Sequence, residues 1–154
     1  MRDIPCAARV RWLAASCRSS FGIGAKDTYE HLDAEPYDDV ARNLAKKFGF
    51  SAVAVTLREN PLVLLNRWSG IVAADGSVHR APHYEVEVVD RIGAGDAFSA
   101  GLIVSRLEGR GWDEAVRFAT AASALKHSIP GDFCLVTRAE VDQLLHGRSL
   151  RVSR

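Results

Sequence analysis

The 154-residue sequence has few cysteines, no long apolar run and no excess of either charge. Its three cysteines form an odd set at spacings unlike those of metal sites, which argues against a disulfide framework. The 20 Lys and Arg, spread along the chain, balance 19 Asp and Glu, which excludes a basic nucleic-acid-binding surface and a disordered composition. No apolar stretch approaches the roughly 20 residues that a membrane span needs. We therefore expect a globular cytoplasmic protein with no membrane or nucleic-acid partner.

The first twenty residues differ in composition from the rest. Met1–Ser20 carries four arginines, one acidic residue and two of the three cysteines. This composition is that of a transit peptide, whereas a lipoprotein signal ending at Cys17 has too short an apolar stretch before it. A poorly ordered terminus or a short helix is the interpretation we adopt. We place a boundary near Phe21 and treat 1–20 and 21–154 as separate segments.

After Phe21, the apolar spacing predicts alternating helices and strands. A helix is expected from Pro36 to Phe48, with Gly49 at its C-terminus, followed by a strand at Ser51–Thr56 that is buried on both faces. Short strands are predicted at Leu62–Leu65, Gly70–Ala74 and Val78–Arg80, with a hairpin turn at Asp75-Gly76. A helix that leads into a buried strand indicates an α/β layer.

The C-terminal half predicts one more strand and then helices. The strand is expected at Glu85–Val89, and the helices at Asp96–Leu107, Asp113–His127 and Thr137–His146. Thr137 and Glu140 have the spacing of a capping box. No internal repeat and no low-complexity tract interrupts the chain, so the pattern describes a single α/β unit.

The most informative stretch is Val88–Gly101, which reads as a strand, a glycine-rich turn and the start of an apolar helix. Glycines in such a turn permit positive φ and a close approach of the main chain to a ligand. Backbone N–H groups at a helix N-terminus favour an anion, above all phosphate. We therefore predict an anion hole at Gly93, Ala94 and Gly95.

Asp96 follows the turn directly and would lie close to a hydroxyl held against a bound phosphate. It would serve as the base that takes the hydroxyl proton during phosphoryl transfer. The alternative is a tight turn in which Asp96 only caps the helix. A dinucleotide fingerprint would need a glycine where Phe98 stands, and the Gly-Lys-Ser/Thr of a Walker A loop is absent.

The segment Asp90–Phe98 resembles the C-terminal signature of the ribokinase-like (PfkB) carbohydrate kinases, an Asp, two variable residues and then Gly-Ala-Gly-Asp. Phe118–Asp132 and Ala54–Glu59 resemble the matching stretches of 2-keto-3-deoxygluconate kinases, and the likeness covers roughly Phe21–Gly147. The resemblance implies the C-terminal part of a three-layer α/β/α sandwich that lacks the N-terminal half and the β lid.

The resemblance also implies roles for individual residues. Asp96 aligns with the base that activates a sugar hydroxyl for attack on the γ-phosphate of ATP, and Gly93, Ala94 and Gly95 align with the anion hole. The implied ATP-binding residues are Thr56, Arg58, Ala121, Ser123 and His127. A monovalent cation such as K⁺ would lie at Asp90 and Ser128, in the Ser128–Asp132 loop. In simpler interpretations, Thr56 ends a strand, His127 complements a helix dipole and Asp90 caps the turn.

Two departures from the family pattern affect the expected activity. The family's Asn-x-x-Glu motif, which helps to place Mg²⁺, is replaced by Ser16–Ser19, which has no carboxylate. Family members are also much longer, and their additional half supplies the sugar pocket and the lid. Our hypothesis is that Met1–Ser20 is a truncated, frameshifted or artificial start. We expect ATP and Mg²⁺ as cofactors, little activity from the chain alone, and self-association through an exposed sheet edge.

Three functions follow from these patterns. The first is a kinase that transfers phosphate from ATP to a sugar acid, with 2-keto-3-deoxygluconate as the expected substrate. The second is a nucleotide-binding module derived from the same family that has lost catalysis. The third is a dinucleotide-dependent oxidoreductase, which the missing third glycine disfavours.

Overall fold

The computed structural model describes residues 10–13, 35–62 and 64–147. The elements in chain order are β1 (Val10–Leu13), α2 (Glu35–Phe48), β2 (Ala52–Leu62), β3 (Leu65–Ala74), β4 (Ser77–Arg80), β5 (Tyr84–Glu87), α3 (Ala94–Leu107), α4 (Trp112–Lys126) and α5 (Arg138–Leu145). The described strands form one sheet in the order β1-β2-β3-β4, and β5 also pairs with β3.

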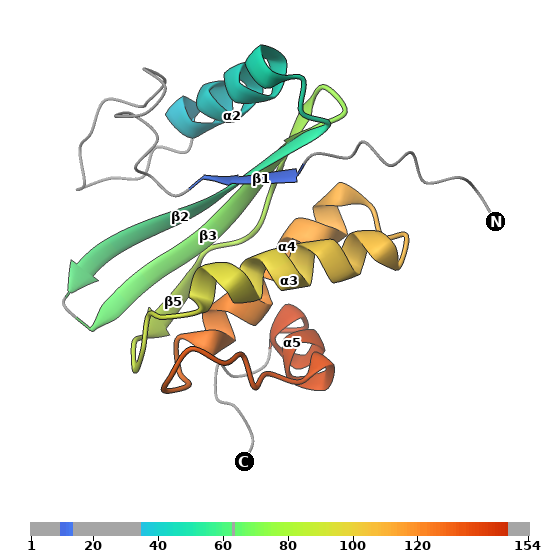
Figure 1. Ribbon diagram of the computed structural model, residues 1–154. Helices are drawn as coiled ribbons and strands as arrows, with labels where there is room; N and C mark the ends of the chain where they lie inside the picture. Colours follow the sequence, from blue (N-terminus) through green and yellow to red (C-terminus); the bar gives the residue numbers. More distant parts are fainter. Residues whose placement is uncertain (1–9, 14–34, 63, 148–154) are drawn as a thin grey trace.

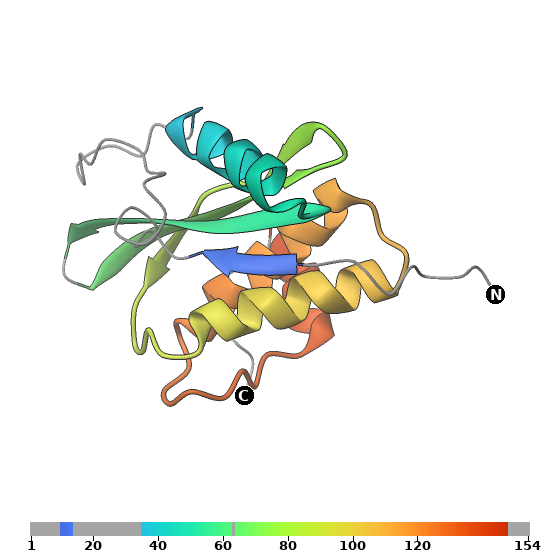
Figure 2. The ribbon, with the colours of Figure 1, turned by 45° about the horizontal axis from the view of Figure 1, so that its top comes forward.

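Helices cover both faces of this sheet (Figure 1). Helix α2 lies on one face, α3 and α4 lie on the other, and α5 packs beyond the sheet against α4 (Figure 2). The alternation of side chains along β2 explains the two layers, because Val53 and Val55 face α2 whereas Ala52 and Ala54 face α3 and α4. All four side chains are buried, which confirms the prediction of a strand buried on both faces.

The first strand contradicts our expectation for the N-terminal segment. Val10–Leu13 pairs in parallel with β2, with Val10 opposite Ala52 and Leu13 opposite Val55. A disordered terminus or a short helix was therefore the wrong prediction for these residues. These residues pair with β2, about 40 positions further along the chain, and the local sequence gives no sign of a partner so distant. The rest of 1–20 and the boundary at Phe21 lie outside the described residues.

The predictions of a hairpin turn and of a separate short strand had different outcomes. Asp75 and Gly76 have φ of 51° and 76° and close the β3–β4 hairpin, as predicted. A separate strand at Leu62–Leu65 was wrong, because Leu62 ends β2 and pairs with Leu65 at the start of β3. Strand β2 continues through Pro61, although proline usually ends a strand, and the register shifts between Glu59 and Leu62.

The helices lie close to their predicted positions. Helix α3 starts at Ala94, two residues before the expected Asp96, and β5 ends at Glu87 rather than Val89. The capping box at the start of α5 is confirmed, since Thr137 and Glu140 bond reciprocally through side chain and backbone. None of the helices in the described ranges combines the length and the apolar character that a membrane crossing requires.

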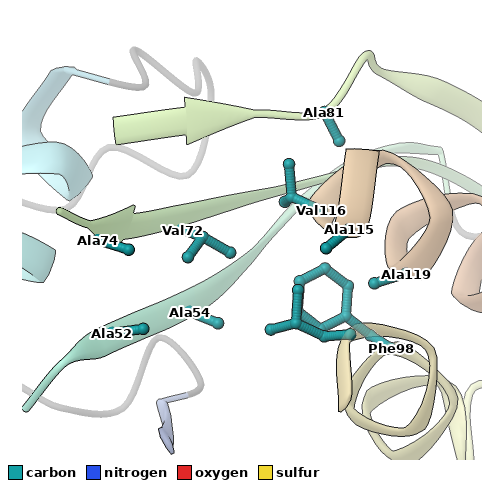
Figure 3. Close-up of a cluster of buried hydrophobic side chains, with 10 residues drawn as sticks. Ala52, Ala54, Val72, Ala74, Ala81, Phe98, Ala115, Val116 and Ala119 are labelled. Atoms are coloured by element: carbon teal, nitrogen blue, oxygen red, sulfur yellow. The ribbon is translucent and has the colours of Figure 1, made fainter. Parts of the chain in front are cut away.

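Helix α3 is anchored to the sheet by Phe98, whose side chain is fully buried. Its ring enters a layer of small side chains from β2 and β3 and from α4 (Figure 3). A side-chain carbon at Gly70 would lie 2.5 Å from this ring, so β3 needs glycine at that position. Close packing of large against small residues thereby fixes the N-terminal half of α3 relative to the sheet.

Candidate active site

The glycine-rich turn lies between β5 and α3, and Gly93 is the N-cap of α3 with φ of 77°. A side-chain carbon at Gly93 would lie 2.1 Å from the carbonyl oxygen of Asp132. The left-handed backbone and the close approach of the Asp132 carbonyl each disfavour any larger residue. The motif therefore needs glycine here for two independent reasons.

The first turn of α3 leaves backbone donors unused. The Ala97 N–H donates to the Gly93 carbonyl at 2.9 Å, and the Ala94 N–H meets the Arg91 carbonyl at 3.5 Å. Within the described part of the chain, the N–H groups of Gly95 and Asp96 donate to no acceptor, and no side chain caps the helix. Neighbouring amides at the positive end of a helix dipole attract an anion.

Asp96 is the third residue of α3, so the alternative in which it caps the helix is wrong: Gly93 is the cap. Its side chain is exposed and forms no hydrogen bond or ion pair with any other described residue. A carboxylate beside unused amides is the arrangement that a general base for a hydroxyl attacking a phosphoryl group would need.

The C-terminal end of α4 supports the turn from behind. The His127 carbonyl accepts the Val89 and Asp90 N–H groups at 2.8 and 3.1 Å. The Ser123 hydroxyl donates to the Ala94 carbonyl at 2.6 Å. Because all three bonds involve the backbone of α3's first turn or of the segment before it, they fix the direction in which the amides of α3 point.

The Asp90 carboxylate connects the turn to the loop that follows α4. Its Oδ1 accepts the Ile92 N–H at 3.0 Å, and its Oδ2 accepts the Gly131 N–H at 2.8 Å. The pKa of Asp90 lies below its ordinary value. The hydrogen bond from Ile92 lowers it most, followed by the bond from Gly131, and the nearby charge of Lys126 also lowers it. Partial loss of hydration raises the pKa but does not outweigh these interactions. Asp90 therefore stays ionised and braces both segments.

His127 is buried beneath the same turn, with its ring edge against Trp68 at a centroid distance of 4.7 Å. Burial lowers its pKa, the bond to Ser123 opposes this, and the charges of Lys126, Arg58 and Arg91 lower the pKa further. The Nδ1 atom lies 2.8 Å from the Ser123 carbonyl, which can only accept, so Nδ1 carries the proton of a neutral ring.

The other residues predicted to bind ATP lie in two settings. Thr56 is half-buried in β2 opposite Gly70, and Arg58 is exposed two positions further along the strand. The side chains of Ala121 and Ser123 in α4 and of His127 at its C-cap are buried. Contact between ATP and these residues stays a prediction, and for the buried three it would need access from solvent.

Sequence reasoning missed three contributors to this region. Lys126 is fully buried, Arg91 is exposed beside the turn, and Gly131 supplies an N–H to Asp90. Gly131 with φ of 82° lies in a loop whose role depends on a contact made across 41 residues of sequence. A lysine at a helix C-terminus usually lies in solvent and complements the helix dipole, and no local pattern in the sequence indicates that Lys126 is buried.

The described residues contain no group of three or more His, Cys, Asp or Glu side chains that would hold a metal ion. Asp96 and Asp90 are thus not parts of a dedicated metal cage. Mg²⁺ commonly binds through one or two carboxylates together with substrate phosphates. The Mg²⁺ that we expect as a cofactor would accordingly depend on the phosphates of a bound nucleotide.

A family model for the pfkB family carbohydrate kinases matches residues 27–132. The chain belongs to this family. A 2-dehydro-3-deoxygalactonokinase of Haloferax volcanii is 31% identical over 115 residues, which are 75% of this chain and 34% of that protein. The predicted family is therefore confirmed.

Solved structures confirm the ribokinase-like fold as a partial domain. The 2-dehydro-3-deoxygluconokinase of Thermotoga maritima matches with a TM-score of 0.81 and 37% identity over 90% of this chain and 41% of its own. The phosphofructokinase-2 of Escherichia coli in complex with potassium shares the fold at 14% identity, with a TM-score of 0.68 over 90% of this chain and 40% of its own. The chain spans less than half of the length of these relatives.

Proposed function

We propose that this pfkB family chain binds ATP at the glycine-rich turn and contributes the catalytic base for phosphoryl transfer to a sugar acid. The unused N–H groups of Gly95 and Asp96, beside the exposed carboxylate of Asp96, are the observation that carries this proposal. At one helix end, the amides would bind an anion and the carboxylate would accept a proton.

In the proposed reaction the acceptor hydroxyl gives its proton to the Asp96 carboxylate while its oxygen attacks the γ-phosphorus. The bond from that phosphorus to the bridging oxygen breaks, and ADP leaves. The Gly95 and Asp96 amides would stabilise the negative charge of the transferring group. Arg58 and Arg91, whose charges both reach His127, would add a positive field on the side from which phosphate approaches.

The substrate class rests on likeness. Relatives named 2-dehydro-3-deoxygalactonokinase and 2-dehydro-3-deoxygluconokinase support a keto-deoxy sugar acid, and 2-keto-3-deoxygluconate is our specific proposal. Because the chain spans less than half of these relatives, we expect weak turnover from it alone. That short span also favours a second candidate, a nucleotide-binding module without catalysis.

The test begins with ATP binding to the 154-residue chain, followed by the chemical shifts of its backbone amides. ATP should shift the Gly95 and Asp96 amide resonances more than those of the matched positions at the start of α4, Asp113 and Glu114. NAD should not reproduce the effect. Saturation by ATP without any change at Gly95 and Asp96 would overturn the proposed site.

Asp96→Asn then separates the kinase from the binding module. The variant should retain ATP affinity, since the backbone donors are unchanged, and lose all ADP release that depends on 2-keto-3-deoxygluconate. Asp113→Asn is the control, because Asp113 is an exposed acid in the first turn of α4. Sugar-dependent turnover that survives in Asp96→Asn would exclude Asp96 as the base. If the unmodified chain shows no sugar-dependent turnover, the binding module is favoured.

A further inference from the structure

Lys126 is a fully buried lysine in the last turn of α4. Its Nζ donates to the Ile129 carbonyl at 3.0 Å, and it forms no ion pair with a carboxylate of the described residues. A charged group removed from water is costly unless polar groups replace its hydration shell. A buried ammonium that rests on a carbonyl group therefore needs a structural or functional reason.

The carbonyl that binds Lys126 belongs to the loop that braces the glycine-rich turn. Two residues after Ile129, Gly131 donates to the Asp90 carboxylate, and the next carbonyl, that of Asp132, lies against Gly93. The charge of Lys126 also acts on Asp90. Lys126 is thus linked through one short loop to both ends of the turn that carries the unused amides.

The same region was expected to hold a monovalent cation at Asp90 and Ser128, but the positive charge of Lys126 already acts on Asp90 and on the Ile129 carbonyl there. Both Asp90 oxygens accept backbone N–H groups, and the Ser128 hydroxyl donates to the Leu125 carbonyl at 2.7 Å. The Ile129 carbonyl already accepts the ammonium. A hard cation needs several converging oxygen ligands, and a fixed positive charge nearby repels it.

We propose that the Lys126 ammonium takes the place of a bound monovalent cation and positions the Gly95 and Asp96 amides through the Ser128–Asp132 loop. Lys126 is a positioning residue, because it touches the loop and not the phosphate site. The inference rests on the proposed binding of ATP at the turn. A resident lysine ammonium would distinguish this chain from the phosphofructokinase-2 of Escherichia coli, which shares its fold and whose structure is described as a complex with potassium.

The test compares the unmodified chain with Lys126→Ala, whose missing side chain would leave room for an ion at the Ile129 carbonyl. ATP affinity is titrated in KCl and in N-methylglucamine chloride at equal ionic strength. The unmodified chain should bind equally in both salts. Lys126→Ala should lose about tenfold in N-methylglucamine and recover most of that loss in KCl. Lys46→Met, at an exposed lysine of α2, should behave as the unmodified chain does.

A second measurement keeps this proposal separate from ATP binding itself. The thermal midpoint of the unmodified chain should be the same in both salts, and that of Lys126→Ala should rise selectively in KCl. If Lys126→Ala does not fold, Lys126→Met is measured in the same way. Potassium dependence in the unmodified chain, or a loss in the variants that potassium does not restore, would overturn the proposal. A chain that shows these thermal shifts without binding ATP would overturn the proposed function alone.

Discussion

The Oδ2 atom of Asp90 accepts the N–H of Gly131 at 2.8 Å, joining the turn before α3 to the loop after α4. The residues are 41 positions apart, and the other carboxylate oxygen bonds Ile92 within the turn itself. The Asp90 side chain therefore makes both a long-range hydrogen bond, to Gly131, and a local one, to Ile92. The position of the α3 amides depends on both.

We expect Asp90→Asn to loosen this connection, because an amide offers one acceptor where the carboxylate offers two. The thermal midpoint and the ATP affinity should both fall. Asp113→Asn, which breaks an exposed ion pair with Arg117, should change them little. Since the pKa of Asp90 is lowered, its stabilising effect is present above its ordinary value of 3.8 and lost as the pH falls through the lower folded value. Equal effects of the two substitutions would refute the bracing role.

Gly93→Ala should destabilise the protein more than Gly109→Ala. The two glycines have φ of 77° and 82°, so the backbone strain of alanine, about 1 kcal/mol, is common to both. Only Gly93 has the Asp132 carbonyl 2.1 Å from the added carbon, whereas nothing lies within 4 Å at Gly109. Urea denaturation gives the two free energies, and ATP titration should show weaker binding for Gly93→Ala alone. Matching losses of stability would mean that the loop moves aside at no cost.

The stability of the protein should decrease as the pH falls below about 6.5, in part through His127. Its pKa is lowered in the folded state, so the unfolded chain binds the proton first and stability is lost between 6.5 and the lower folded value. His127→Gln should flatten this dependence. His146→Gln is the control, because His146 also bonds the carbonyl four residues before it but is exposed. Thermal midpoints between pH 5 and 8 measure the slope, and an unchanged slope in His127→Gln would contradict the assignment.

Gly70→Ala and Phe98→Leu should compensate each other. Alanine at position 70 would place a carbon 2.5 Å from the Phe98 ring and 2.9 Å from the Thr120 hydroxyl, which costs about 1 to 3 kcal/mol. Leucine at position 98 removes part of the ring. The double variant should therefore lose at least about 0.5 kcal/mol less than the sum of the single variants. Urea denaturation of all four proteins completes the cycle, and strict additivity would show that the ring is not what excludes a side chain from β3.

Much of the candidate site was predictable because it is local in sequence. The turn from Gly93 to Asp96 combines a residue of positive φ with a helix start within four residues. A glycine followed by a helix of small residues predicts both features. The hairpin at Asp75-Gly76 and the capping box at Thr137 were predicted for the same reason. Each is decided by bonds between residues a few positions apart.

The supports of the site were not predictable in this way. Ser123 was predicted only to bind ATP, and the bond from its hydroxyl to the Ala94 carbonyl joins residues 29 positions apart. Burial of His127 against Trp68 depends on how α4 packs on β3, and composition carries no signal for it. The wrong prediction of a separate strand at Leu62–Leu65 has a related cause, since β3 pairs with β2 on both sides of the register shift and β2 continues past Pro61, a residue type that usually ends a strand.

The sequence by itself determined which residues form the glycine-rich turn, because backbone conformation and helix initiation are short-range properties of a few amino acids. It also determined the alternation of helix and strand, through the period of the apolar residues. The tertiary structure alone decided that Val10–Leu13 is a strand, that Lys126 is buried and that Asp90 holds the loop after α4. These depend on contacts between distant segments, and burial and hydrogen bonding there exist only once the layers have packed together.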